Sequence, residues 1–243
     1  MAAAEALQPL GLNHSLLHDG FARLRPVEMA AALAVPGPAL AGFAASWDGL
    51  ETDSFMADGG RYRRRRHANF TALPGQAPRR GLHRPHFQAS VHNSLNGGLD
   101  RWFAPMLDAT VANPATAALL ALGGRAADAL HPGRGWFIEM HQFRIEAAAG
   151  APGYPTPEGT HHDGVDLVLI AMIDRRNLTG GETLVTDNAG GELARFTLDG
   201  MLDATILDDA RVMHGVTPIA PGDAAQPSRR DVLVVTWKAL GAD

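Results

Sequence analysis

The second half of the chain consists of short apolar segments separated by turn residues. Seven such segments, most of them six to ten residues long and rich in Val, Ile, Leu and Thr, occupy residues 135–145, 161–173, 182–187, 192–198, 203–209, 212–219 and 231–237. Gly, Pro, Asp and Asn recur in the stretches between them. Segments of this kind at this spacing are typical of the strands of a sandwich or barrel. We therefore predict that residues 132–240 form a mainly β structure.

The first half of the chain has helical patterns instead. Apolar residues at helical spacing predict helices at residues 14–34 (interrupted near Pro26), 38–50, 97–107 and 113–130. Asn113 is a plausible N-cap for the last of these helices. Residues 61–70 are predicted to form an early strand. Since an apolar sheet face must be covered, we expect one α+β, mainly β domain over residues 1–243, in which the helix-rich residues 1–131 pack on one sheet of the β core.

The composition limits the available chemistry and partners. The chain has no cysteine and a formal net charge of −5. Any transition metal must therefore be held by His, Asp or Glu. The acidic balance argues against a nucleic-acid partner, and no apolar run approaches the roughly 18 residues of a membrane span. The N-terminus lacks the basic region of a signal peptide. We expect a cytoplasmic protein that acts on a small molecule; a homodimer is compatible with the sequence.

Two histidines and an aspartate stand at the start of one predicted strand, in the sequence THHDGVDLVLI. If the strand includes them, alternate side chains share a face, so His161 and Asp163 point one way and His162 points the other way. The pair that can chelate one ion is then His161 with Asp163. A helix would instead pair His162 with Asp166, but a glycine and the β-branched run that follows argue against a helix.

Two ligands do not make a stable metal site, so a third should come from elsewhere in the fold. The candidates are His14, His18, His67, His83, His86, His92, His131, His141 and His214. His214 stands out because it lies in a short predicted strand, 15 and 16 residues before Arg229 and Arg230 at the start of the next strand. Two histidines and one carboxylate on one face of an octahedron leave three positions open, which suits Fe(II) and oxygen chemistry.

Several further motifs accompany these residues in a fixed order. Within residues 61–238 the chain contains RYRR, HQFRI, PEGTHHDGVD, RRNLTGGET, HGVTPI and RRDVLVVTW. As an ordered set they resemble the Fe(II)/2-oxoglutarate-dependent dioxygenases, and more narrowly the bacterial group that contains L-isoleucine dioxygenase and the biofilm–stress–motility proteins. The resemblance implies a double-stranded β-helix (jelly-roll) core with N-terminal helices. It also implies that His161, Asp163 and His214 hold iron.

The same resemblance implies Fe(II) as cofactor, 2-oxoglutarate and O₂ as co-substrates, and hydroxylation of a free aliphatic L-amino acid. An arginine near the last strand would pair with the distal carboxylate of 2-oxoglutarate. We favour Arg230, which adjoins the strand proper, because a planar guanidinium can hold a carboxylate through two hydrogen bonds. Only one of the two arginines can point inward, and we expect Arg229 to be solvated. Thr183 and Thr186 could offer hydroxyls, although threonine is common in strands without such a role.

An amino-acid substrate needs an anchor for its carboxylate, an anchor for its ammonium group and an apolar pocket. In residues 135–145, His141 and Arg144 fall on opposite faces of the predicted strand, and one of these faces should line the barrel interior. Residues 88–98 are expected to form a polar loop that closes over the site. The candidates for contact with the substrate are His141, Arg144, Arg63, Arg65, Tyr62 and Asn93.

Two other functions are compatible with the metal ligands. A Zn(II)-dependent hydrolase can use two histidines and an aspartate to activate water, but it would need neither 2-oxoglutarate nor an arginine after the distal histidine. A non-catalytic, metal-binding jelly-roll protein in stress response or biofilm formation would not need the complete set of His161, Asp163, His214 and Arg230.

Overall fold

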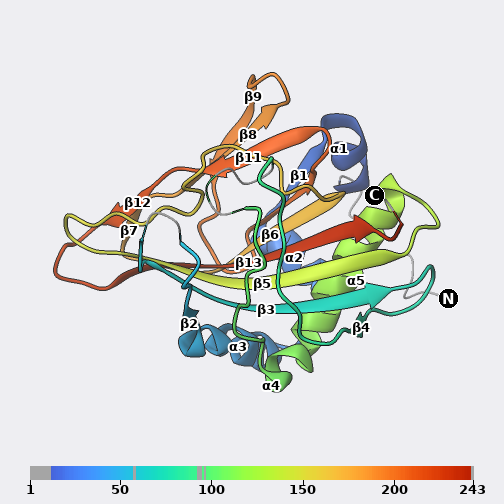
Figure 1. Ribbon diagram of the computed structural model, residues 1–243, viewed down its shortest axis with the longest axis horizontal. Coiled ribbons are helices and arrows are strands. Elements are labelled where there is room, and N and C mark those ends of the chain that lie inside the picture. Colours follow the sequence, from blue (N-terminus) through green and yellow to red (C-terminus); the bar gives the residue numbers. More distant parts are fainter. Residues whose placement is uncertain (1–11, 57–58, 92–94, 96, 242–243) are drawn as a thin grey trace.

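The long strands of the chain lie in one antiparallel sheet. The structure is a computed structural model that describes residues 12–56, 59–91, 95 and 97–241. Within these residues an eight-stranded sheet has the order β1 (Phe21–Leu24), β10 (Ala204–Asp208), β6 (Leu167–Arg176), β13 (Ser228–Ala239), β5 (Trp136–Ala147), β3 (Arg63–Ala72) and β2 (Glu51–Thr52), with β4 (Arg79–Arg80) paired to β3 (Figure 1).

Smaller sheets pack against one face of the large sheet. One contains β11 (Val212–Val216), β8 (Glu182–Asp187) and β9 (Glu192–Thr197), and the other pairs β12 (Ile219–Pro221) with β7 (Leu178–Gly180). Ile170 and Val232 of the large sheet share a buried cluster with Val185 and Val212 of the smaller sheet. Antiparallel sheets packed over such a core form the jelly roll that the sequence predicts.

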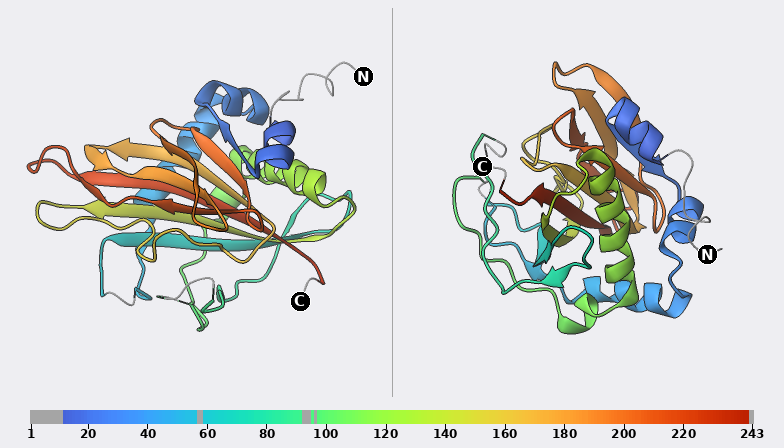
Figure 2. Two further views of the ribbon diagram at one scale, coloured as in Figure 1. Left: turned by 90° about the horizontal axis from the view of Figure 1, so that it is seen from above. Right: turned by 90° about the vertical axis from the view of Figure 1, so that its right-hand side faces the viewer.

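Helices cover the opposite face of the large sheet, as predicted (Figure 2). They are α1 (Leu12–Asp19), α2 (Pro26–Leu33), α3 (Gly37–Ala45) with the 3₁₀ turn η2 (Ser46–Gly49), α4 (Asp108–Val111) and α5 (Pro114–Leu130). The helix α5 lies against β13 and β6. Its Gly123 faces Trp237, and a Cβ atom at this glycine would stand 2.0 Å from the indole ring. The missing side chain lets the helix approach the sheet closely, which offsets the poor helix propensity of glycine.

Local sequence signals predict some of these helices better than others. Asn113 caps α5 as predicted, since its side chain accepts a hydrogen bond of 2.8 Å from the Ala115 amide. The predicted helix at 14–34 is interrupted earlier than expected, because Phe21–Leu24 forms strand β1 on the edge of the large sheet. Pairing with β10 decides this segment, and no pattern within the segment itself reveals that partner.

The helix predicted at residues 97–107 is wrong. This segment is extended and runs beside the sheet, where the His67 amide donates to the Ala104 carbonyl and the Met106 amide donates to the His67 carbonyl. Arg101 forms a similar two-way backbone pair with His86. Several backbone groups of the segment are therefore satisfied by distant partners and not by a helix.

Among the described helices, no single one has both the length and the apolar character of a membrane span. The α2 helix and the α3–η2 segment meet these criteria only as a pair, bent by 108° at the break between them.

Candidate metal and carboxylate site

The predicted metal ligands come together at one side of the jelly-roll interior. The His161 Nε2 atom lies 3.5 Å from Asp163 Oδ1, and the His214 Nε2 atom lies 3.8 Å from Asp163 Oδ2. One ligand atom from each of the three residues can be chosen so that all lie within 4.8 Å of one another. The arrangement fits a metal ion bound on one face by two imidazoles and one carboxylate.

The backbone brings the two histidines together. His161 and His214 exchange hydrogen bonds between their amides and carbonyls, at 3.0 and 3.1 Å. His214 lies on β11, whereas His161 lies in the loop before β6. The strand expected from residue 160 onward begins only at Leu167. The strand predicted over His161 and Asp163 is therefore wrong, although the two side chains do face each other.

A buried aspartate holds the loop that carries Asp163. The carboxylate of Asp209 accepts backbone hydrogen bonds from Asp163, Gly164 and Val165, at 2.9, 2.7 and 3.1 Å. Gly164 has a positive φ of 79°, which favours glycine at this turn. His162 does not belong to the group of three ligands and bonds through Nδ1 to the Asp209 carbonyl. This loop, and not a strand, sets the position of Asp163.

The three ligands shift one another's pKa values. Burial alone would raise the pKa of Asp163, but the hydrogen bond from His161 and the charges of both histidines hold it well below its usual range. For His161, burial lowers the pKa, but Asp163 and Glu158 outweigh this effect and raise it to about 9. Burial and the charge of His161 lower the pKa of His214 to about 4. The Asp163 carboxylate is ionised and the His214 imidazole is neutral, which are the forms that bind a cation. A bound cation would replace the proton on His161.

A cavity of about 430 Å³ lies beside the three ligands. Its walls include alternate residues of β5 and β13, because side chains on a strand alternate between the two faces of the sheet. Phe137, Glu139, His141, Phe143 and Ile145 line it from β5, and Arg230, Val232, Val234 and Thr236 line it from β13. The intervening residues of both strands face the helices or the outer surface.

Arg230 points into this cavity and is almost fully buried. Its Nε and Nη2 atoms have no hydrogen-bond partner within the part of the chain that the structure describes. Burial and the charge of Arg175 lower its pKa to about 10, so the guanidinium stays charged at neutral pH. A buried cation with unused donors is costly unless an anion pairs with it. The site therefore fits a ligand that carries a carboxylate.

Arg229 faces the other way. Its Nη2 atom donates to Asp174 at 3.1 Å, and its side chain is partly exposed. Thr183 and Thr186 are buried, and their hydroxyls lack hydrogen-bond partners among the described residues. Thr183 pairs across the sheet with Val216, a residue of the cavity wall. Its contact with 2-oxoglutarate stays a prediction.

The predicted substrate residues are divided between the two faces of the sheet. Arg63, Arg65 and His141 line the cavity. Arg144 does not point there, because it lies on the opposite face of β5 and bonds to Asp231 through two hydrogen bonds of 2.8 Å. We correct its assignment on this ground.

Tyr62 and Asn93 are placed differently from those residues. Tyr62 lies just before β3, where its ring packs edge-on against Tyr154 at 5.8 Å. Asn93 lies outside the described residues. Other residues of the predicted loop do reach the cavity, since Gln88 donates to Asp163 Oδ1 at 3.3 Å.

The cavity also contains charged residues that the sequence did not indicate as functional. Glu139, Arg101 and Glu158 line it, together with His86. Glu139 lies two residues before His141, so alternation places it on the same strand face, although it gives Glu139 no role. Arg101 could not be placed in this way, because it lies within residues 97–107, for which a helix was predicted.

Comparison with known proteins agrees with this geometry. The family model for 2OG-Fe dioxygenases matches residues 44–236. A 3(1)-hydroxy-L-isoleucine 4-dioxygenase from Pantoea ananatis (strain AJ13355) is 28% identical over 102 residues, 42% of this chain and 41% of the relative. An L-isoleucine-4-hydroxylase from Bacillus thuringiensis is 26% identical over 157 residues, 63% of this chain and 64% of the relative. In both cases the matched region spans less than two thirds of the curated relative.

Solved structures share the fold over nearly the whole chain. A bsmA homologue from Methylobium petroleophilum PM1 superposes with a TM-score of 0.87 at 38% identity, covering 95% of this chain and 93% of the other. The IDO structure from Bacillus thuringiensis superposes with a TM-score of 0.78 at 18% identity, covering 94% of each chain. Because the family model covers most of the sequence, we conclude that the chain belongs to the 2OG-Fe dioxygenase family, whose cofactor is Fe(II) and whose co-substrates are 2-oxoglutarate and O₂.

Proposed function

We propose that the chain hydroxylates a free aliphatic L-amino acid. In this proposal His161, Asp163 and His214 hold Fe(II), and Arg230 binds the distal carboxylate of 2-oxoglutarate. The observation that carries it is the buried Arg230 guanidinium, which faces the same cavity as the three ligands and has unused donors among the described residues. The substrate class is supported by the names of the two curated relatives, which both act on isoleucine or a hydroxyisoleucine.

The overall reaction balances as follows. A substrate C–H bond, 2-oxoglutarate and O₂ give a C–OH group, succinate and CO₂. Bound iron supplies the oxidising chemistry, and the protein supplies binding, orientation and a site from which water is excluded. Apolar side chains such as Ile170, Val216 and Val232 line part of the cavity, which suits an aliphatic side chain near the metal ligands.

The alternatives leave Arg230 unexplained. A Zn(II) hydrolase could use the three ligands, but a buried guanidinium that faces the same cavity, with unused donors among the described residues, would serve no step of water activation. A non-catalytic metal-binding protein would likewise gain nothing from a buried cation that costs stability. A carboxylate co-substrate gives this residue a role.

Succinate formation tests the proposal. The protein is loaded anaerobically with Fe(II) and 2-oxoglutarate, then exposed to air with the twenty L-amino acids added singly, and products are read by mass spectrometry. We expect succinate coupled to a product that is 16 mass units heavier than one aliphatic amino acid. Succinate without such a product would contradict the substrate class alone. No succinate with any amino acid, although iron is shown to be bound, would overturn the proposed function.

A further inference from the structure

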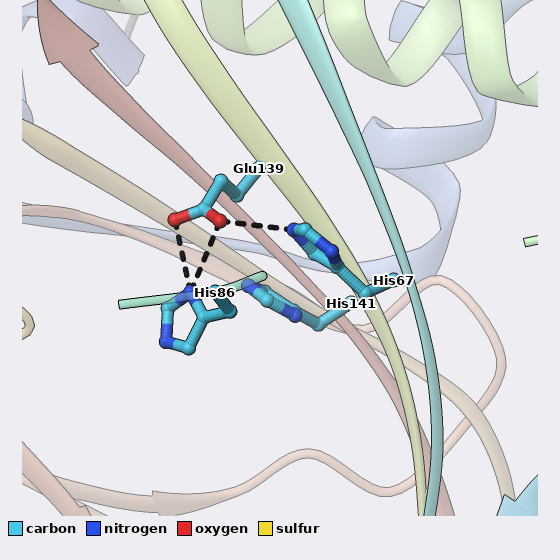
Figure 3. A group of neighbouring side chains, drawn as sticks. All are labelled: His67, His86, Glu139 and His141. Atoms are coloured by element: carbon cyan, nitrogen blue, oxygen red, sulfur yellow. Dashed lines mark hydrogen bonds and ion pairs between the residues drawn. The ribbon is translucent and has the colours of Figure 1, made fainter. Parts of the chain in front are cut away.

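A second group of polar side chains lies in the same cavity and takes no part in holding the metal. Glu139 and His141 come from β5, His67 comes from the neighbouring strand β3, and His86 comes from the segment after β4. Figure 3 shows the Glu139 carboxylate in contact with the rings of His67 and His86, with His141 beside them. We call these four residues the Glu139 cluster.

The cluster holds one negative charge on Glu139. His67 Nε2 donates to Glu139 Oε1 at 2.9 Å, and His86 Nδ1 lies 3.0 Å from both carboxylate oxygens. Burial alone would raise the pKa of Glu139, but these two hydrogen bonds lower it to about 2. Burial also lowers the pKa of all three histidines, so they are neutral near pH 7. A carboxylate can accept about four hydrogen bonds, so this one has room for a further donor.

Buried arginines adjoin the cluster. Arg65 Nη2 donates to His141 Nδ1 at 2.7 Å, and the Arg65 guanidinium lies 3.5 Å from the centre of the Phe103 ring. Arg101 is 2% exposed and donates to Gln88 at 3.3 Å. The Nε atoms of both arginines lack hydrogen-bond partners within the described part of the chain. Glu139 is close enough for its charge to raise the pKa of each of them, against the effect of burial.

The nearest full counter-charge is already used by another arginine. Asp53 lies 2.7 Å from Arg63 and 3.7 Å from Arg65 Nη1, and it also accepts the Phe55 amide at 2.9 Å. One aspartate thus serves two arginines, and the described residues give Arg101 no ion pair. Glu139 and Glu158 are the other acidic residues whose charges act on Arg101. This end of the cavity therefore holds separate buried cations and anions, which favours a ligand that carries both charges.

We propose that this end of the cavity binds the charged head group of the substrate, with Glu139 receiving the ammonium group and Arg65 with Arg101 receiving the carboxylate. The inference rests on the proposed function and names the residues that would recognise a free amino acid. In an α-amino acid the two charges are separated by one carbon atom, so the recognising charges must also adjoin each other. Glu139 and Arg65 do not touch, but they line the same cavity and are connected through His67 and His141, which leaves room for the head group between the anion and the cation.

The same arrangement disfavours a second metal ion in the cluster. Three histidines and one carboxylate are suitable ligand types. However, His141 Nδ1 already accepts from Arg65, and a divalent cation would lie beside guanidinium groups in a poorly solvated site. An ammonium group brings one charge together with a carboxylate that neutralises it, so the zwitterion is the better occupant.

The proposal predicts that both head groups are required. A ligand without the amino group loses the contact with Glu139, and an N-acetyl derivative replaces the cation by a neutral amide. The experiment measures anaerobic binding calorimetrically, with Zn(II) as a redox-inert metal and with 2-oxoglutarate present. The probes are L-isoleucine, L-leucine, L-methionine and L-valine, followed by the des-amino and N-acetyl derivatives of the tightest binder.

Glu139→Gln is the central variant, and Glu146→Gln is its matched control. Glu146 lies on the same strand but pairs with Arg64 outside the cavity, half exposed. We expect Glu139→Gln to weaken amino-acid binding about 30-fold or more, as expected for loss of a buried charge pair. Binding of the des-amino acid should change by less than about threefold on the same argument. Arg101→Met should weaken both ligands, because both carry the carboxylate, and Glu146→Gln should weaken neither.

The outcomes separate this inference from the proposed function. Equal weakening of the amino acid and its des-amino analogue by Glu139→Gln would overturn the ammonium assignment. A second equivalent of Zn(II) that binds the wild type and is lost in Glu139→Gln would replace it by a metal site. Absence of amino-acid binding by the wild type would overturn the inference, whereas succinate formed with another substrate would leave the oxygenase assignment intact. If Glu139→Gln fails to fold, the wild-type protein tests the proposal through its affinities for the amino acid and for the des-amino analogue. Tighter binding of the des-amino analogue would overturn the proposal.

Discussion

Replacing Arg230 by methionine should have opposite effects on stability and on co-substrate binding. The guanidinium is buried and has unused donors among the described residues, and burial lowers its pKa to about 10, well below its ordinary value. Because the folded pKa is lowered, the charged form is disfavoured in the native state at every pH below about 10. Each pKa unit corresponds to about 1.4 kcal/mol, so the buried charge costs about 3 kcal/mol at neutral pH. Arg230→Met should therefore stabilise the ligand-free protein by up to about that amount.

The same substitution should weaken 2-oxoglutarate binding. Loss of one partner of a buried, charge-assisted pair costs about 2 to 5 kcal/mol, or roughly 30-fold to several thousand-fold in Kd. Arg229→Met is the matched control, since its side chain bonds to Asp174 on the other face of the sheet. That ion pair is partly exposed and should contribute less than about 1 kcal/mol to stability.

Two measurements check this prediction. Urea unfolding of the metal-free protein gives the change in the free energy of unfolding, and anaerobic calorimetry with Zn(II) gives the Kd of 2-oxoglutarate. The expected result is higher stability and much weaker binding for Arg230→Met, with neither change for Arg229→Met. If both variants bind 2-oxoglutarate like the wild type, the keto acid is anchored elsewhere and the reasoning fails. If Arg230→Met instead destabilises the protein, the guanidinium is not an unpaired charge.

Three further changes test the structure around the site. Asp209→Asn weakens the carboxylate that accepts three backbone hydrogen bonds in the loop carrying Asp163. It should lower the metal affinity about 10- to 100-fold in a competition titration. Unchanged affinity would mean that other contacts hold the loop. Gly123→Ala should lower the free energy of unfolding, measured in urea, by about 1 to 3 kcal/mol, because the added methyl group overlaps the Trp237 indole ring. Gly124→Ala is the control: no described atom lies within 4 Å of its Cβ position, so the substitution should stabilise the protein by up to about 1 kcal/mol. Equal effects of the two substitutions would refute the close packing. Glu139 has a pKa of about 2 against an ordinary 4.5, so its contribution to stability is present above pH 4.5 and lost as the pH falls toward 2. Glu139→Gln should flatten this part of the curve of unfolding free energy against pH, and an unaltered curve would contradict the ionised, hydrogen-bonded carboxylate.

Local patterns in the sequence determined several parts of this protein. The strand-rich second half, the capped helix at 114–130 and the alternation that separates Arg230 from Arg229 all follow from interactions between residues near one another in the chain. Alternation also separates His141 from Arg144, but it does not say which face of the strand is interior. That choice depends on which face the helices cover, since one face of the sheet must be buried beneath them.

Tertiary structure alone decided how the site is assembled. His161 and Asp163 face each other because Asp209, some 46 residues away, holds the loop between them and β6, and not because they lie in a strand. The segment at 97–107 has a helical pattern but is extended, since its backbone bonds to His67 and His86. In the Glu139 cluster, Glu139 bonds to histidines that are 53 and 72 positions away in the sequence. Contacts over such separations depend on sheet register and loop closure, which sequence periodicity does not encode, and they bring charged groups together only once the fold is complete.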